Sequence, residues 1–102
     1  MAGTFTGITW YPLPSAQSGP YDLAVVGEQV LFTEMDGDRL GRLRPYPSPG
    51  AILELYLPGS APAGLSADIL GCAWIAESGG SKIARWCPPY VPSTYLPIMT
   101  RS

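Results

Sequence analysis

The chain contains the stretch Leu31-Phe32-Thr33-Glu34, which is followed after a short turn by Arg39-Leu40-Gly41-Arg42-Leu43. The same pattern returns 43 residues later as Trp74-Ile75-Ala76-Glu77 and Lys82-Ile83-Ala84-Arg85-Trp86. The glutamate and both basic positions recur at the same spacing. A period in the forties that is carried by short β-type runs is typical of the blades of a β-propeller.

The flanking sequence follows the same repeat. Leu13-Pro14 recurs as Leu57-Pro58, Pro20 and Leu23 recur as Pro62 and Leu65, and a third copy begins at Tyr95-Leu96-Pro97. Apolar runs between Pro, Gly and Asp turns predict strands over residues 8–14, 20–26, 29–33, 39–44, 51–57, 63–67, 72–77, 82–87 and 94–99. No window has the periodicity of a helix.

We therefore predict an all-β chain of β-propeller blades, with two four-stranded antiparallel units and one extra N-terminal strand. Residues 1–7 are expected to be a flexible N-terminus, 8–50 the first repeat, 51–94 the second repeat, and 95–102 the start of a third repeat or a closing strand. Two blades leave two apolar faces uncovered, whereas propellers close with roughly four to eight blades. We expect the chain to complete a propeller by self-association, or to be part of something longer.

The composition excludes several classes of partner. The chain has 6 Lys and Arg against 8 Asp and Glu, a formal charge of −2, which argues against nucleic-acid binding. No apolar run approaches the roughly 18 residues of a membrane span, so no membrane partner is expected. The N-terminal residues do not read as a signal peptide, and we expect a cytoplasmic location.

The two cysteines, Cys72 and Cys87, are expected to be thiols in that location. A hairpin closed at Glu77 and Lys82 would nevertheless place them opposite each other, with Cβ atoms about 4.5–5.5 Å apart. That separation is close to the reach of a disulfide, so both states stay open. The chain has no histidine and only two sulfur ligands, and no metal site is expected from its residues.

The order of the repeated motifs resembles the streptogramin B (virginiamycin B) lyase family of β-propellers. The resemblance covers residues 8–97 and rests on Leu-Pro, then Pro-x-x-Leu, then an apolar run ending in Thr-Glu, then a basic residue before Leu-Gly-Arg-Leu. It implies a propeller fold of seven blades and a lyase activity that uses a histidine base and a bound magnesium ion.

This chain departs from the family pattern at several positions. Asp38 and Ser81 stand where an Asn is usual, Ala84 replaces the Gly, Trp86 replaces an aliphatic residue, and histidine is absent. The resemblance therefore implies the fold, while function depends on the site that the fold carries. The magnesium ligands cannot be identified in this chain.

Acidic residues are the candidate bases. Glu34 and Glu77 end a strand beside a tight turn, where they would serve as general bases or metal ligands at a central channel, or would close their hairpins by cross-strand pairs with Arg39 and Lys82. Asp22 and Asp68 lie on or after the innermost strands and are further candidates. Arg42, Arg85 or Lys82 would stabilise an enolate-like charge.

Aromatic residues are the candidate ligand contacts. Tyr46 and Tyr90 lie on proline-rich loops and are available to touch a ligand, and Trp74 and Trp86 are either a stacking surface or part of the core between blades. With Lys82 they complete the candidate ligand-binding set.

Three functions follow from these patterns. The first is a small-molecule-binding or scaffold propeller module. The second is an enzyme of small-molecule metabolism, a lyase or isomerase that uses a carboxylate base. The third is an inactive fragment or an engineered piece of a propeller.

Overall fold

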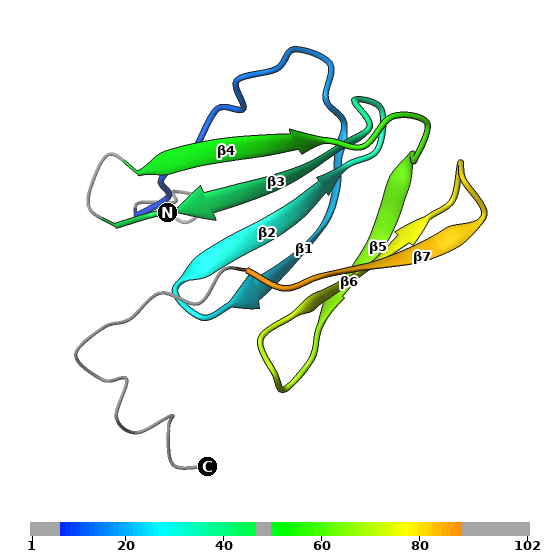
Figure 1. Cartoon of the computed structure of the whole chain (residues 1–102). Helices are drawn as coiled ribbons and strands as arrows, with labels where there is room; N and C mark the ends of the chain where they lie inside the picture. Colours follow the sequence, from blue (N-terminus) through cyan, green and yellow to red (C-terminus); the bar gives the residue numbers. More distant parts are fainter. Residues whose placement is uncertain (1–6, 47–49, 89–102) are drawn as a thin grey trace, which may run out of the picture.

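The computed structural model describes residues 7–46 and 50–88, which form two antiparallel sheets (Figure 1). The first sheet has the order β1 (Pro20–Val26), β2 (Gln29–Glu34), β3 (Arg39–Arg44), β4 (Ala51–Tyr56), and the second has the order β5 (Pro62–Ala67), β6 (Ala73–Glu77), β7 (Lys82–Trp86). The described residues include no helix, and so none that could cross a membrane. The all-β prediction is confirmed.

The N-terminal segment differs from the prediction. Residues 8–14 are not a strand, although an extra strand was expected there. Pro12 and Pro14 lack the N–H group that a sheet ladder requires, and no described strand pairs with this segment. The chain instead runs along the first sheet, where the Ser15 hydroxyl donates a hydrogen bond to Glu54 at 2.6 Å. The strand predicted over 94–99 lies outside the described residues.

The sheets are offset from the sequence repeats by one strand. β4 is an edge strand, as expected for the start of the second repeat, but it pairs along its whole length with β3 of the first sheet. The first sheet therefore has four strands, and the second has three within the described part of the chain. The second repeat thus contributes its first strand to the first sheet.

The two sheets share one pairing register. Leu23 pairs with Phe32 in the first sheet, and Leu65 pairs with Ile75 in the second, each next to a bulge in the inner strand. The β2–β3 and β6–β7 turns also agree, because Asp38 and Ser81 both have φ of 55°. Asn and Asp adopt this left-handed region more readily than most residues, which explains why Asn is usual at this turn position.

The core lies between the sheets. Val26, Leu31 and Ala73 are buried together, and Leu65 and Trp86 pack against them. Burial of one face of each sheet against the other is the arrangement that neighbouring propeller blades use. Trp86 is thus a core residue between the sheets.

The two cysteines are joined in a disulfide, which corrects the expectation of thiols. The pairing of Ala73 with Trp86 sets Cys72 opposite Cys87, as the predicted hairpin register requires, and their Cα atoms are 4.2 Å apart. The hairpin register therefore predicted the state of the two cysteines better than the expected cytoplasmic location did.

Gly41 is required by the aromatic ring opposite it. Gly41 pairs with Phe32, and a Cβ built on Gly41 would lie 2.1 Å from ring atoms of Phe32. The second sheet has Ala84 at the equivalent position, where the opposite residue is the smaller Ile75. The pairing thus explains why one repeat keeps the glycine and the other does not.

We expect Gly41→Ala to lower the free energy of unfolding by about 2 kcal/mol, because the buried Phe32 ring must move out of its place. Urea unfolding followed by circular dichroism measures the effect. The double variant Gly41→Ala/Phe32→Ile copies the pair of the second sheet and should recover most of the loss. A single variant as stable as the wild type would contradict this account of the glycine.

Candidate functional site

A pair of carboxyl groups lies buried in the first sheet. Glu34, at the end of β2, is fully buried, and neither of its carboxyl oxygens has a hydrogen-bond partner among the described residues. Glu54 of β4 lies on the same face, since Glu34 pairs with Arg39 and Glu54 pairs with Gly41 across β3. One oxygen of Glu54 accepts the bond from Ser15, and the other has no partner in the described part.

Burial, and after it the neighbouring Glu54 carboxyl, raise the pKa of Glu34 to about 7, against a smaller opposing effect of Arg39. Two carboxylates at close range cannot both ionise at low cost. The pair is therefore expected to hold a proton near neutral pH. Glu34 has the pKa of a general base, but it is closed off from solvent.

Arg39 does not close the β2–β3 hairpin through Glu34. Its Nε atom lies 3.9 Å from Glu54, and its guanidinium carbon lies 5.5 Å from the centre of the Tyr56 ring. The guanidinium thus leans across β4. In the second sheet Glu77 is buried opposite the exposed Lys82, and no ion pair joins them in the described residues.

Asp22 connects the two sheets. Its carboxylate accepts hydrogen bonds from the backbone N–H groups of Leu23 and Leu65, both at 2.8 Å. Thr33 adds a second connection, because its hydroxyl donates to the carbonyl of Ala63 at 2.8 Å. Asp38 adds a third by accepting from the N–H of Ala61 at 2.8 Å. Asp22 thus has a structural task, and its proposed role as a base stays a prediction.

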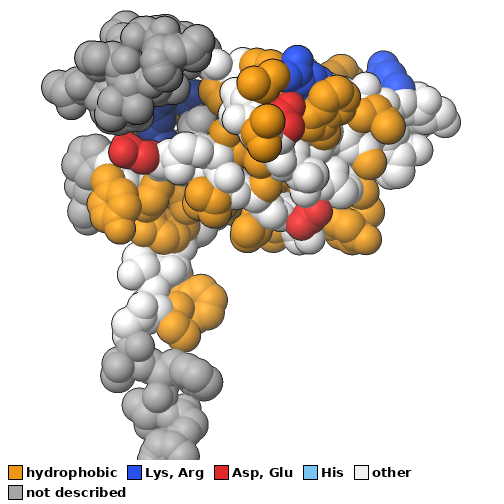
Figure 2. All heavy atoms as spheres, turned by 90° about the horizontal axis from the view of Figure 1, so that it is seen from below, with side chains coloured by type: hydrophobic (Ala, Val, Ile, Leu, Met, Phe, Trp, Pro, Cys, Tyr) orange, Lys and Arg blue, Asp and Glu red, His pale blue; other side chains and the backbone are white. Residues whose placement is uncertain are grey.

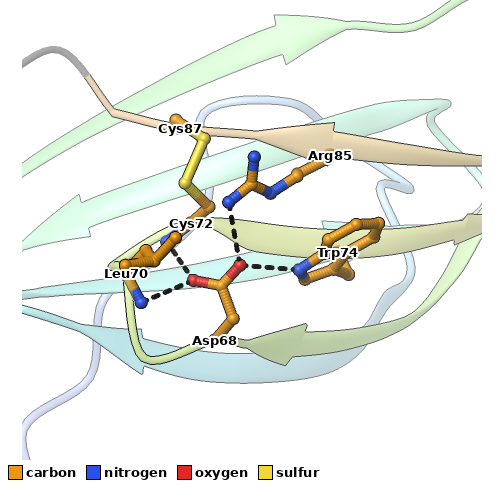
Figure 3. Close-up of a disulfide and its surroundings, with 6 residues drawn as sticks. All are labelled: Asp68, Leu70, Cys72, Trp74, Arg85 and Cys87. Carbon is orange, nitrogen blue, oxygen red and sulfur yellow. Dashed lines mark hydrogen bonds and ion pairs between the residues drawn. A yellow bond between two sulfur atoms is a disulfide. The ribbon is translucent and has the colours of Figure 1, made fainter.

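Asp68 organises the turn between β5 and β6 (Figure 3). Its carboxylate accepts the backbone N–H groups of Cys72 and Leu70, the indole N–H of Trp74 at 2.8 Å, and the guanidinium of Arg85 at 3.2 Å. The bond from Cys72, followed by that from Trp74, holds the pKa of Asp68 at about 2. An aspartate with this pKa is a poor proton acceptor near neutral pH.

Arg85 and Trp74 stack beside this carboxylate. The Arg85 guanidinium carbon lies 5.2 Å from the centre of the Trp74 ring. Both side chains are on the exposed face of the second sheet, and Trp74 is 44% exposed. Asp68 thereby fixes an apolar and cationic patch on the surface.

A groove runs beside the junction of the two sheets. It has a volume of about 210 Å³ and is lined by Leu31, Leu40, Arg42, Leu53, Glu54, Leu55 and Trp86. No carboxylate pairs with Arg42 among the described residues. The groove thus combines apolar walls with a guanidinium and joins two predicted site residues, Arg42 and Trp86.

The other candidate ligand contacts do not gather with these two. Tyr46 is 81% exposed on the loop after β3, and Lys82 is exposed at the start of β7. Trp74 lies on the outer face of the second sheet rather than in the groove. Tyr90 lies outside the described residues. The predicted site residues therefore form separate clusters.

Comparisons with known proteins find their matches among solved structures. No protein-family model matches the chain, and no curated protein matches it. A streptogramin B lyase structure is 32% identical, with 81% of this chain and 31% of that chain covered and a TM-score of 0.63. The two sheets resemble the blades of a streptogramin B lyase.

Two structures of the virginiamycin B lyase from Staphylococcus aureus agree. A catalytically inactive histidine-to-alanine variant with quinupristin is 29% identical, with 83% of this chain and 32% of that chain covered and a TM-score of 0.65. The selenomethionine-substituted lyase is 30% identical over 82% of this chain and 32% of that chain, with a TM-score of 0.63. The resemblance predicted from the repeats is confirmed, and the chain spans about a third of the length of these lyases.

The magnesium ion implied by the lyase resemblance does not fit the described residues. They contain no group of three or more Asp, Glu, Cys or His side chains that would hold a metal ion. The buried pair of Glu34 and Glu54 has the Arg39 cation beside it, and the raised pKa of Glu34 favours a proton rather than a divalent ion.

The sequence analysis missed Glu54, Thr33 and Ser15. The sequence did contain a signal for Glu54. Ile52, Glu54 and Tyr56 occupy every second position of an otherwise apolar strand, so the glutamate shares a face with two large side chains. The roles of Thr33 and Ser15 had no such signal. Each depends on a partner that the fold brings from 30 or more residues away.

Proposed function

We propose that this chain is a small-molecule-binding module of the β-propeller type rather than a catalyst on its own. The groove beside Arg42 and Trp86 is the observation that carries the proposal. Apolar walls with few polar groups are typical of small-molecule sites. The ligand class that fits is a small apolar molecule with one anionic group, which Arg42 would pair with by a charge-assisted hydrogen bond.

The state of the candidate bases supports binding over catalysis. Glu34 and Glu77 are buried, Asp22 bonds the N–H of Leu65, and Asp68 is engaged by four donors. A general base must reach the proton that it removes, in a position open to the substrate. None of these four carboxylates combines exposure with an open acceptor.

The binding proposal is tested with anilinonaphthalene sulfonate, an apolar probe with one negative charge. Its fluorescence titration should give a dissociation constant about tenfold weaker for Arg42→Gln than for the wild type. Arg44→Gln is the matched control, since Arg44 lies two residues along the same strand and does not line the groove. N-phenylnaphthylamine, which lacks the sulfonate, should bind wild type and Arg42→Gln alike. Equal weakening of sulfonate binding in both arginine variants would overturn the proposal.

A lyase is the second candidate function, and the similarity to streptogramin B lyases is the observation that favours it. The inactive lyase variant lacks one histidine, and this chain has none to supply. Incubation with quinupristin, followed by mass spectrometry, separates the two candidates. Unchanged quinupristin supports the binding module, and a chemically altered product would support the enzyme.

A further inference from the structure

Each sheet has one face that packs against the other sheet and an outer face that exposes apolar side chains. In the first sheet, the side chains of Leu31 and Leu40 point toward the second sheet and are 0% and 4% exposed. The opposite side of this sheet, the first outer face, is partly covered where Ser15 bonds Glu54, but it also carries Leu23, Val25 and Tyr56, which are 57–65% exposed. Large apolar side chains on a sheet face mark a surface that a partner covers.

The second sheet is open on its other side. Its second outer face carries Trp74, Ile83 and Arg85, because Trp74 pairs with Arg85 and the burial along β6 alternates. Trp74 is 44% and Ile83 is 72% exposed. In the view of Figure 2, hydrophobic side chains reach the surface at both its upper and its lower edge.

The shared register relates these faces to the contact inside the chain. Trp74 is the counterpart of Leu31, and Ile83 is the counterpart of Leu40, at the same shift of 43 residues. The second sheet thus presents outward the positions that the first sheet buries. Leu23 in turn is the counterpart of Leu65, which packs in the core between the sheets.

The two outer faces therefore carry the counterparts of the two surfaces that pack against each other within the chain. Such a contact joins different surfaces, so it can repeat from copy to copy and close into a ring. We propose that copies of this chain associate head to tail, with the second outer face of one copy on the first outer face of the next. Three copies would bring six sheets together, which lies within the roughly four to eight blades with which propellers close.

The polar contacts predict that association is weaker than the packing inside the chain. Within one copy, Asp22 and Thr33 form hydrogen bonds to β5, and Asp38 forms one to Ala61 just before β5. Their counterparts in the second sheet are Gly64, Ala76 and Ser81, which lack a carboxylate. Between copies the contact thus rests on apolar burial around Trp74, whose ring Asp68 and Arg85 hold in place.

The test measures the mass in solution by light scattering, with one variant for each face. Wild type should form a species of three times the 10.9 kDa chain mass, which dissociates on dilution. Leu23→Asp blocks the first outer face and Ile83→Asp blocks the second, so each variant alone should be monomeric. Ile69→Asp is the control, because Ile69 is 99% exposed in the β5–β6 turn, and it should form the wild-type species.

Mixing the two blocked variants gives the sharpest result. Each retains one open face, so together they should form a dimer of one copy of each and nothing larger, with the circular dichroism of a β protein. If copies instead joined through two identical faces, one of the variants would still be a dimer by itself, and mixing would give no new species. That result would overturn the proposal. A monomeric wild type at all concentrations would do the same, and a ring of another mass would overturn the count of three.

Discussion

Reduction of the Cys72–Cys87 disulfide is expected to lower the free energy of unfolding by about 3 kcal/mol, the value for a closed loop of this size. The two cysteines are 15 residues apart and close the β6–β7 hairpin, whose far end is the Glu77–Lys82 turn. Without the cross-link, the unfolded chain regains the conformational entropy that the closed loop had removed. Urea unfolding followed by circular dichroism, with and without reductant, measures the difference.

The control is the double variant Cys72→Ala/Cys87→Ala. We expect it to be less stable than the oxidised wild type, because it lacks both the cross-link and the buried sulfur of Cys72. Reductant should nevertheless leave its unfolding curve unchanged. A wild-type curve that does not respond to reductant would contradict a stabilising role for the disulfide. Because disulfides persist where thiols are not kept reduced, the bond also makes the compartment of the protein worth measuring.

Replacement of Glu34 by Gln is expected to stabilise the protein by about 3 kcal/mol at about pH 8, and to change little at about pH 5. The pKa of Glu34 is raised from 4.5 to about 7 in the folded state. Between these values the folded protein keeps a proton that the unfolded chain releases. Stability therefore falls as the pH rises through this window, and the loss is complete above the folded pKa.

Gln has nearly the shape of the protonated glutamate and does not ionise, so it avoids this loss. The difference between the unfolding free energies of wild type and variant isolates the effect, because the other titrating groups are common to both. Glu28→Gln is the matched control, because it removes a charge of the same sign in the exposed β1–β2 turn, away from the buried pair. A pH-independent difference for Glu34→Gln would contradict the buried proton.

Hairpins and their registers were predictable from the sequence. The pairing of Glu34 with Arg39 and of Glu77 with Lys82 follows from apolar runs on either side of short turns. The opposition of Cys72 and Cys87 follows from the same register. Such features are local, so a few neighbouring residues specify them.

The carboxylate site was less predictable. Glu34 was a candidate, but its buried partner Glu54 lies 20 residues away on a strand that the repeat assigned to the next unit. A pattern shows that a side chain faces inward. It does not show which second charge shares the space and adds to the effect of burial on the pKa of Glu34.

The amino-acid pattern alone specified the all-β class, the hairpin registers and the repeated blade, since alternation and turn residues act over a few positions. The tertiary structure was needed to show that β4 completes the first sheet, that Asp22 and Thr33 hold the second, and that Asp68 is engaged by four donors. These features depend on which distant strands meet, and the packing of whole sheets settles that choice. Equivalent positions such as Leu31 and Trp74 thus have one chemistry in the repeat and different surroundings in the fold.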